Sequence, residues 1–341
     1  MGIKEVAKLA GVSVSTVSRI VNGKDPTAAS SQTQAKIWEA VRELRYIPNQ
    51  HAQNLKSRQG EGMMETPRKR DIDCIYARLA GAHLDPFFTG LISAVEVEAF
   101  RVGYQMRYYY SALDIQQGNF SQKSTEVDSA VILGRASADV LNVVRGLYKH
   151  IVYSGLNETS TDIDQVLCNG YQASEKCVQH LALLGHRVIC YMGETVNEQR
   201  FQGYLDAMAA LELPVTEAQI VETPFTPRGG YDAVNELMRR NLSFTSIFCA
   251  NDISAIGALK ALREKRLKVP QDVSVIGIND MDTVRYLDPM LTSIHIPLEE
   301  MGKITAKILI DRIEGGRKLP IKVELPTKLV VRESCGPVRL K

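Results

Sequence analysis

The sequence predicts a small all-α head followed by a larger α/β domain of two lobes. The chain of 341 residues is longer than one ordinary domain, and its 45% hydrophobic and 23% charged residues are typical of globular proteins. The first part shows only the 3.6-residue period of helices. From Asp71 onward, strand-like and helix-like runs alternate along the chain.

Two short helices joined by a tight turn open the chain. Apolar residues line one face of a predicted helix over residues 3–10, and Gly11 can adopt the left-handed backbone that a turn requires. Ser13 is a suitable N-cap for a second helix over residues 14–21, which Asn22-Gly23 ends.

A supporting third helix is expected to start near Ser30. Ile37, Val41 and Leu44 mark its buried face at spacings of four and three. The three helices together make a helix-turn-helix, in which the second helix presents its N-terminal residues to the major groove of DNA.

The charge distribution agrees with a DNA-binding head. Residues 1–70 carry 12 Lys/Arg and 6 Asp/Glu, which leaves 29 and 33 of the chain's 41 and 39 for the remainder. A basic head on a mildly acidic body is expected when only the head meets phosphate, although basic heads also occur on proteins that bind no DNA.

The body alternates strands and helices, as parallel sheets covered by helices do. In such sheets ligands bind beyond the carboxyl ends of the strands, here in a cleft between the lobes. Strands are expected over residues 72–79, 104–110, 130–133, 151–154, 188–192, 246–250 and 273–278, and helices over 88–103, 171–184, 200–211, 229–240 and 253–265.

The sequence contains no catalytic constellation. It has no G-x-G-x-x-G after the first strand, no P-loop, no G-x-S-x-G and no H-x-x-x-H. His186 joins a helix to a strand, so we expect a structural role for it.

The six cysteines lie scattered, mostly in apolar runs, which indicates buried reduced thiols rather than disulfides or zinc ligands. We therefore expect a protein that is not an enzyme and has no cofactor or metal.

The apolar runs of the sequence are too short to cross a membrane, and no apolar signal segment follows Met1. We therefore expect a cytoplasmic protein without a membrane partner.

The stretch IKEVAKLAGVSVSTVSRIVNG, with AVRELRYIPNQHAQNL after it, closely resembles the head of the lactose-repressor (LacI–GalR) family. By position, this resemblance implies base contacts for Val14, Ser15 and Arg19. It implies phosphate contacts or helix capping for Ser13, Thr16, Ser18 and Asn22.

The segment from Asn49 to Ser57 matches the family's hinge, which folds on operator DNA, and Leu55 would wedge into a minor-groove step. Leu55 could instead pack against the body, although its neighbours are polar. The expected domains are therefore a head over residues 1–48, a hinge helix over 49–58, a linker over 59–70, and a two-lobed effector-binding and dimerisation domain over 71–341.

The body resembles the family's effector domain, whose fold is that of type I periplasmic sugar-binding proteins. The matching words include DPFFTGLISAVEVEA, RFQGYLDAM and FCANDISAIGALKALREKRLKVPQDVSVIGIND. The resemblance implies a pocket that suits a sugar, with an aromatic platform and polar groups for the hydroxyl rim. Its residues would be Asp85, Phe87, Phe88, Ser154, Arg200, Phe225, Asn251 and Asn279.

Several of these pocket residues also have a purely structural explanation. Phe225 could be ordinary core, Arg200 could pair with a surface carboxylate, and Asn251 could do no more than cap the helix that follows it. Many relatives have Asp where this chain has Asn279, so the pattern of hydroxyls that is recognised can differ.

Two stretches bear on how this chain differs within the family. The stretch from Ser111 to Val127 is shorter and more polar than the usual helix there. The words AVILGRASADVL and YKHIVYSG resemble the galactoside-responsive subset.

The sequence thus predicts a repressor that binds specific DNA and responds to a small molecule, and it argues against two competing classes of protein. A transport solute-binding protein carries a signal peptide and has no use for a helix-turn-helix, and an enzyme on this scaffold needs catalytic groups that are missing. A pseudo-palindromic operator requires at least a homodimer. No leucine heptad follows Leu329, so we expect no tetramerisation helix. We adopt induction as the sign of the response.

Overall fold

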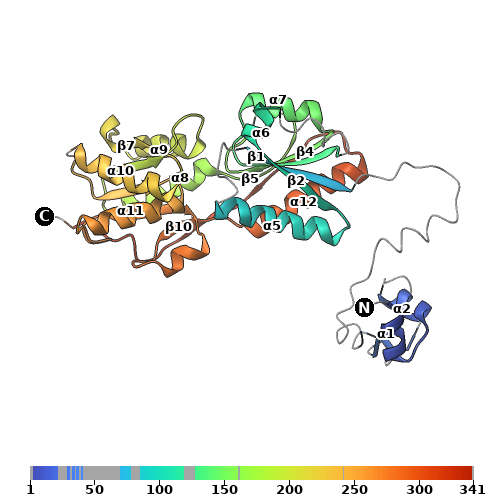
Figure 1. Ribbon diagram of the computed structural model, residues 1–341. Coiled ribbons are helices and arrows are strands. Elements are labelled where there is room, and N and C mark those ends of the chain that lie inside the picture. Colours follow the sequence, from blue (N-terminus) through green and yellow to red (C-terminus); the bar gives the residue numbers. More distant parts are fainter. Residues whose placement is uncertain are drawn as a thin grey trace. The chain divides into compact units, whose positions relative to one another are not determined.

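The computed structural model describes residues 3–21, 29–30, 33–34, 36–37, 40, 70–77, 85–118, 127–159, 162–240 and 242–339. The chain divides into two compact units, Met1–Arg68 and Lys69–Lys341, which are described separately below (Figure 1).

The head has the predicted helices. α1 (Ile3–Ala10) and α2 (Val14–Val21) flank Gly11, whose φ of 68° is the left-handed turn expected from the sequence. Within the third predicted helix, Ile37 and Ala40 are helical, whereas Val41 and Leu44 lie outside the described residues. The head's small core consists of Val6, Ala7, Ala10, Val17, Ile37 and Ala40.

The first lobe of the body is built on a sheet with the strand order β11-β5-β4-β3-β1-β2, in which neighbouring strands pair in parallel. Its strands are β1 (Asp71–Tyr76), β2 (Gln105–Ser111), β3 (Ser129–Leu133), β4 (His150–Gly155), β5 (Asp164–Cys168) and β11 (Lys322–Leu325). β1, β3 and β5 are buried almost throughout, as expected of a parallel sheet with helices on both faces.

Helices cover both faces of this sheet (Figure 1). α5 (Pro86–Arg101) and α12 (Leu298–Gly315) pack together on one face, and α6 (Ala112–Gln116) and α7 (Ala138–Leu147) lie on the other. The five-residue α6 stands where the sequence is unusually short and polar, and Ser111 and Asp114 close a capping box at its start.

The second lobe repeats the architecture with the strand order β12-β10-β9-β8-β6-β7, in which β10 and β12 pair antiparallel. Its strands are β6 (Ile189–Gly193), β7 (Ile220–Glu222), β8 (Ser246–Cys249), β9 (Ser274–Asn279), β10 (Thr292–His295) and β12 (Lys328–Val330). Its helices are α8 (Gly170–Leu183), α9 (Gln199–Ala210), α10 (Pro227–Arg239) and α11 (Asp252–Glu264), with 3-10 turns η3 (Glu217–Gln219) and η4 (Asp282–Tyr286).

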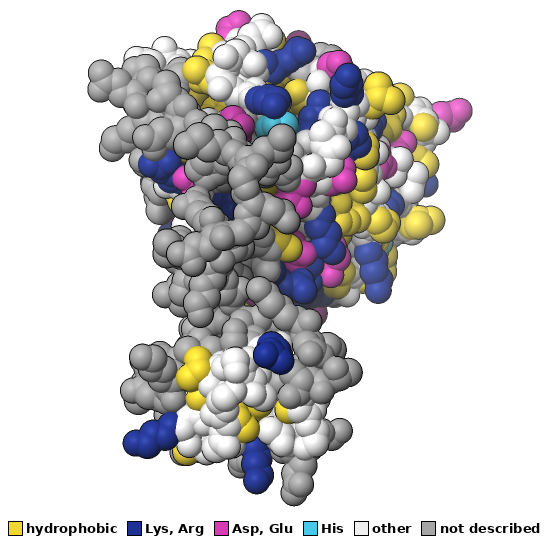
Figure 2. All heavy atoms as spheres, turned by 90° about the vertical axis from the view of Figure 1, so that its right-hand side faces the viewer, with side chains coloured by type: hydrophobic (Ala, Val, Ile, Leu, Met, Phe, Trp, Pro, Cys, Tyr) yellow, Lys and Arg dark blue, Asp and Glu magenta, His cyan; other side chains and the backbone are white. Residues whose placement is uncertain are grey.

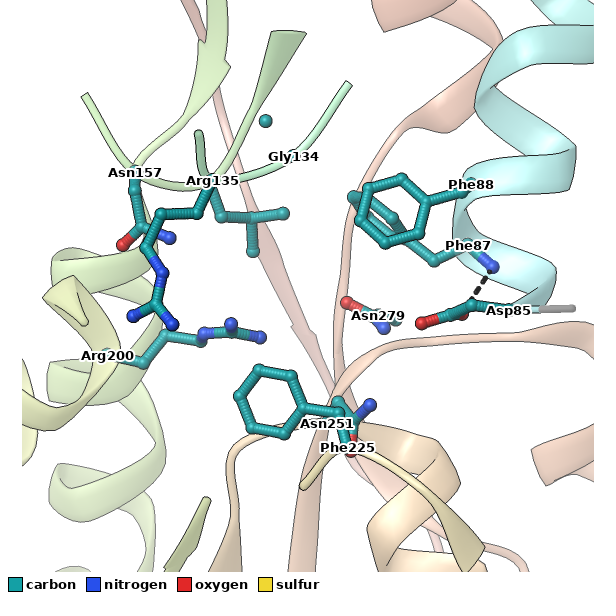
Figure 3. Close-up of a pocket in the computed structure, with 12 residues that line it drawn as sticks. Asp85, Phe87, Phe88, Gly134, Arg135, Asn157, Arg200, Phe225, Asn251 and Asn279 are labelled. Carbon is teal, nitrogen blue, oxygen red and sulfur yellow. Dashed lines mark hydrogen bonds between the residues drawn. The ribbon is translucent and has the colours of Figure 1, made fainter. Parts of the chain in front are cut away.

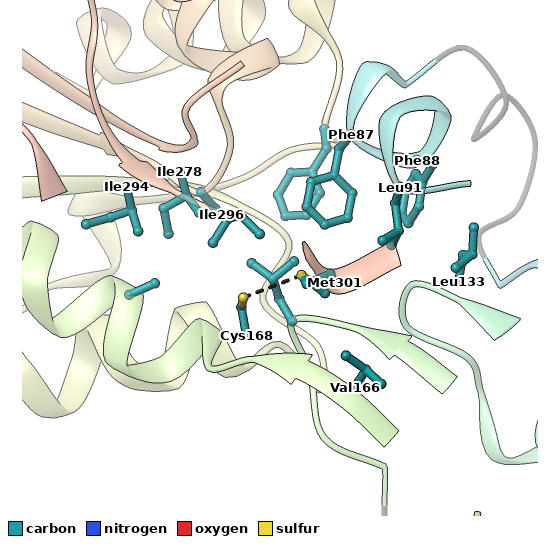
Figure 4. Packing of buried hydrophobic residues seen from close by; sticks show 14 of the residues in the cluster. Phe87, Phe88, Leu91, Leu133, Val166, Cys168, Ile278, Ile294, Ile296 and Met301 are labelled. Atoms are coloured by element: carbon teal, nitrogen blue, oxygen red, sulfur yellow. Dashed lines mark hydrogen bonds between the residues drawn. The ribbon is translucent and has the colours of Figure 1, made fainter. Parts of the chain in front are cut away.

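The chain passes between the lobes after β5, after β10 and after β11. One hydrophobic cluster continues across these passages: Phe87 and Leu91 of the first lobe belong to it together with Ile278 and Ile294 of the second (Figure 4). The two lobes therefore share a packed core where the chain crosses between them.

The seven predicted strands are all present, with ends that differ by a few residues. The first was expected over residues 72–79, but β1 ends at Tyr76. The sequence did not indicate β5, β7, β10, β11 or β12, which have only three to five residues and carry polar side chains. These segments are strands because their backbones pair with a neighbouring strand. The residue pattern of three to five positions does not reveal that pairing.

Candidate functional site

The recognition helix has the capped start that the sequence predicts. Ser13 Oγ accepts a hydrogen bond from the backbone N–H of Thr16 at 3.1 Å and lies 2.7 Å from Ser15 Oγ. Val14, Ser15 and Arg19 are exposed, while Val17 is buried against α1. Ser15 and Arg19 are four residues apart and so share one face of the helix. α2 thus leaves its expected base-contacting side chains free of the head's core.

A cavity lies between the two lobes at the carboxyl ends of their parallel strands (Figure 3). This is the position where open α/β sheets bind ligands. The cavity is lined by Asp85, Phe87, Phe88, Gly134, Arg135, Gly155, Leu156 and Asn157 from the first lobe, and by Arg200, Phe225, Asn251 and Asn279 from the second.

Arg200 is held tightly at the start of α9. Its Nε and Nη2 donate to the two carboxylate oxygens of Glu198 at 2.8 and 2.9 Å, and its Nη1 donates to the carbonyl oxygen of Ala250 at 2.8 Å. Its guanidinium carbon lies 4.4 Å from the centre of the Phe225 ring. Arg200 thus pairs with a carboxylate, but the partner is the buried Glu198 and not the surface carboxylate that the sequence left open as an alternative. A ligand would meet the N–H groups that remain on the two Nη atoms and the ring face of Phe225 that Arg200 does not cover.

Glu198 is the buried counter-charge beneath this arginine. Burial by itself would raise the pKa of Glu198, but the charges and hydrogen bonds of Arg200 and Arg135 hold that pKa below its ordinary value. Glu198 also caps α9 by accepting the N–H of Arg200 at 3.2 Å. The carboxylate therefore stays ionised, and the guanidinium keeps its position at the cavity wall.

Two asparagines line the second lobe's side of the cavity. Asn251 Oδ1 accepts from the N–H of Ser254 at 3.0 Å and so caps α11, which the sequence allowed as an alternative or additional role. Its Nδ2 is the group left for a ligand. The buried Asn279 Oδ1 has no hydrogen-bond partner among the described residues, and the backbone of Asn279 has a φ of 129°. A buried acceptor without a partner fits a ligand that brings a donor.

The first lobe contributes an aromatic wall. Asp85 caps α5 by accepting from the N–H of Phe87 at 2.9 Å. The rings of Phe87 and Phe88 meet edge to face, with centroids 5.2 Å apart. A Cβ at Gly134 would lie 2.7 Å from the Phe88 ring, so the glycine lets the loop after β3 approach the wall closely.

Two polar residues of the lining were missed by the sequence analysis. Arg135 follows β3 and Asn157 follows β4, so both lie at strand carboxyl ends, and that position was the available signal. Ser154, which was expected to contact the ligand, does not line the cavity. Its side chain is fully buried one residue before the lining Gly155. Successive side chains of a strand point to opposite faces, which places Ser154 in the sheet's packing.

The remaining expected DNA contacts Asn22, Asn49 and Leu55 lie outside the described residues, and the side chain of Ser18 is not described.

His186 has the structural role that the sequence predicts. Its Nδ1 lies 2.8 Å from Thr245 Oγ1, and its Nε2 lies 3.0 Å from Ser274 Oγ. Cys74, Cys168, Cys177, Cys190 and Cys249 are buried and free, and Cys335 is half-buried. No cluster of His, Cys, Asp or Glu that could hold a metal occurs in the described part of the chain, and none of the helices described there is long and apolar enough to span a membrane.

A helix-turn-helix head together with a two-lobed, cavity-bearing domain defines the class of DNA-binding regulators that carry a ligand-binding module. Residues 2–49 match the model for bacterial regulatory proteins of the lacI family, and residues 178–335 match a periplasmic binding protein-like domain. The repressor PurR of Yersinia pestis (strain Pestoides F) is 32% identical to this chain over 349 aligned positions, which cover 99% of this chain and 98% of that protein. The chain belongs to the lacI family and is a DNA-binding transcriptional repressor, not an enzyme.

Solved structures show the same fold over the whole length. The transcriptional regulator CelR in complex with cellobiose has a TM-score of 0.70 and 28% identity, covering 98% of this chain and 99% of that one. The Escherichia coli repressor ascG has a TM-score of 0.64 and 27% identity over 78% of this chain and 99% of that one. The operator-bound lac repressor dimer has a TM-score of 0.69 and, at 21% identity over 98% of both chains, shows the fold alone.

Proposed function

We propose that this repressor binds its operator as a homodimer and releases it when a neutral sugar occupies the cavity between the lobes. The observation that carries this proposal is the lining of the cavity. It combines aromatic rings with asparagine amides and a guanidinium, which is the chemistry that suits the C–H faces and hydroxyl rim of a sugar.

The charges around the cavity favour an uncharged ligand. Arg200 is neutralised by Glu198, and Arg135 forms ion pairs with Glu194 and Glu198. With Asp85 added, the surroundings hold no surplus of positive charge for a phosphate or carboxylate group.

One related structure, that of CelR, contains cellobiose. A lacI-family regulator from Enterococcus faecium contains ribose but, at 24% identity, shows the fold alone. The segments AVILGRASADVL and YKHIVYSG resemble the galactoside-responsive subset of the family, so galactosides are the first class of ligand to test. Three phenylalanines would also accept a flat heterocycle, so nucleobases are the competing class.

The proposed mechanism links the cavity to DNA through the hinge over residues 49–58. A ligand that binds one arrangement of the lobes better than another shifts their equilibrium by its difference in affinity. The first lobe, which follows the hinge in the chain, then changes its position relative to the first lobe of the partner protomer. Leu55 loses its minor-groove site, and the phosphate and base contacts of Asn49, Asn22 and α2 weaken with it.

An apolar strip on the first lobe is our candidate for the dimer contact. Val97 and Phe100 of α5 are 59% and 67% exposed, and Tyr109 of β2 donates a hydrogen bond to Glu96 beside them. On the face of the body seen in Figure 2, hydrophobic side chains gather along one side. Two heads need two half-sites, so a second copy of this chain is the occupant that the function requires.

A thermal-shift screen of the full chain tests the ligand class. A ligand that binds the folded state raises the melting temperature, by an amount that grows with its concentration relative to Kd. Monosaccharides, galactosides, cellobiose, sugar phosphates and nucleobases form the panel. A concentration-dependent shift with a neutral sugar supports the proposal. A shift with nucleobases or sugar phosphates and none with neutral sugars contradicts it.

A further inference from the structure

The side chain of Arg135, on the loop after β3, contacts the other lobe at the cavity. Arg135, on the first lobe, donates hydrogen bonds to the carboxylate of Glu194 and, at 2.5 Å, to the carbonyl oxygen of Val196, both on the second lobe. Its Nη1 also lies 3.5 Å from Glu198 Oε2. Figure 3 shows Arg135 extending toward Arg200 along the rim of the cavity. One side chain thus joins the loops at the carboxyl ends of β3 and β6.

A second hydrogen bond crosses the cleft beside it. Asn157, which follows β4 in the first lobe, accepts from the backbone N–H of Gln199 at 2.9 Å, at the start of α9. Glu198 precedes Gln199 in the chain and forms ion pairs with Arg135 of the first lobe and Arg200 of the second. The start of α9 is therefore the place where contacts between the lobes and the proposed ligand-binding guanidinium meet.

We infer that Arg135 and Glu194 form a latch that holds the lobes together independently of effector and thereby sets the effector affinity. Only the second part of this inference, the effect on effector affinity, rests on the proposed function. The side chains of the pair are 26% and 25% exposed, so water screens them only in part. A latch of this kind raises the fraction of chains with closed lobes, and apparent affinity falls in proportion when that fraction falls.

The geometry provides a variant that separates the latch from direct ligand contact. Arg135 lines the cavity, so its replacement would weaken binding under either explanation. Glu194 pairs with Arg135 but does not line the cavity. If Arg135 served only to contact the ligand, Glu194→Gln would leave affinity unchanged or improve it, because the guanidinium would be released toward the ligand.

The test measures the full-length protein in two ways. Hydrogen exchange of the peptide covering residues 194–204, without ligand, reports the opening of the contact at the start of α9. Calorimetric titration with the sugar found in the screen reports affinity. The variants are Arg135→Gln, Glu194→Gln and their combination. The control is Glu212→Gln, an exposed position just beyond the end of α9.

The latch predicts faster exchange in all three variants and a rise in Kd of roughly fivefold in each, with the combination no worse than either single change. Unchanged exchange in Glu194→Gln overturns the latch, as does a Kd that rises only in Arg135→Gln. If exchange quickens but no sugar binds any protein, the latch stands and the proposed ligand class fails. Glu212→Gln should match the parent in both measurements.

Discussion

At the scale of single residues, Arg200 shows how one side chain can serve both structure and ligand. The sequence indicated an arginine that binds ligand hydroxyls or pairs with a surface carboxylate, and the contacts show a pair with the buried Glu198 instead of a surface group. Replacing a buried ion-pair partner leaves the other charge without compensation, which typically costs ~3–5 kcal/mol. A loss of function in an Arg200 variant would therefore not by itself identify a ligand contact.

Arg200→Ala is expected to lower the melting temperature of the body clearly, because Glu198 is left buried without its main partner. Phe225→Ala removes a buried ring from the core but leaves no buried charge without its partner, so it should lower the melting temperature less, yet should abolish the sugar-induced shift. Calorimetry with and without sugar measures both effects. Adding Glu198→Gln to Arg200→Ala should recover part of the lost stability. Equal melting temperatures for the two single variants would contradict this account of Arg200.

Arg19 is the residue at which DNA specificity can be tested. It is exposed on the same face of α2 as Ser15. Arg19→Ala should weaken binding to the cognate operator by about 1–3 kcal/mol, while binding to random DNA of equal length changes much less, because phosphate contacts elsewhere persist. Fluorescence anisotropy with both duplexes gives the comparison. An equal loss on both would identify Arg19 as a phosphate contact.

At the scale of elements, a buried carboxylate joins α11, β9 and β10 below the cavity. Asp252 accepts from Ser293 Oγ at 2.6 Å and from the N–H of Met281 at 2.9 Å. Ser293 Oγ also accepts the N–H of Asp280 at 3.1 Å. These bonds fix the turn that holds Asn279 and Asp280 at positive φ, where residues other than glycine are uncommon. The network thereby positions the unpartnered Asn279 amide oxygen.

Burial raises the pKa of Asp252 from 3.8 to about 7 despite the hydrogen bonds from Ser293 and Met281. Because the folded-state pKa lies above the unfolded one, this group stabilises the fold most below pH 4, and that contribution is lost as the pH rises to about 7. The melting temperature of the parent minus that of Asp252→Asn should therefore be larger at pH 5 than at pH 8. A difference that is the same at both pH values would show that Asp252 is ionised in the folded protein throughout this range and would contradict the raised pKa.

Five helices of the body (α5, α8, α9, α10 and α11), the longer strands and most of the cavity residues could be predicted from the sequence because their signals are local. The sequence analysis did not predict α6, α7 or α12. Gly11, Ser13 and Asn251 act within a few residues of their own position. Short strands such as β11 and β12 were missed because distant partners define them. Arg135 was missed for the same reason: its contacts lie about 60 residues further along the chain, on the other lobe.

At the scale of the whole molecule, the apolar strip on α5 is expected to join two copies. Phe100→Asp should shift the protein from dimer to monomer, since a charge would be buried at the contact, and should weaken operator binding accordingly. Analytical ultracentrifugation over a range of concentrations measures the change. Leu183→Asp is the matched control, because Leu183 is 87% exposed on α8 of the other lobe. Dissociation by the control alone would place the contact there.

The central claim is that occupancy of the cavity by a ligand controls the affinity of the head for operator DNA. A titration of sugar into the complex of full-length protein and labelled operator, followed by anisotropy, tests it directly. The parent should release operator with a midpoint that follows the sugar's Kd, and Phe225→Ala should bind operator equally well but remain bound at every sugar concentration. If the sugar binds the parent by calorimetry and operator affinity stays the same, the cavity does not control the head and the account is wrong.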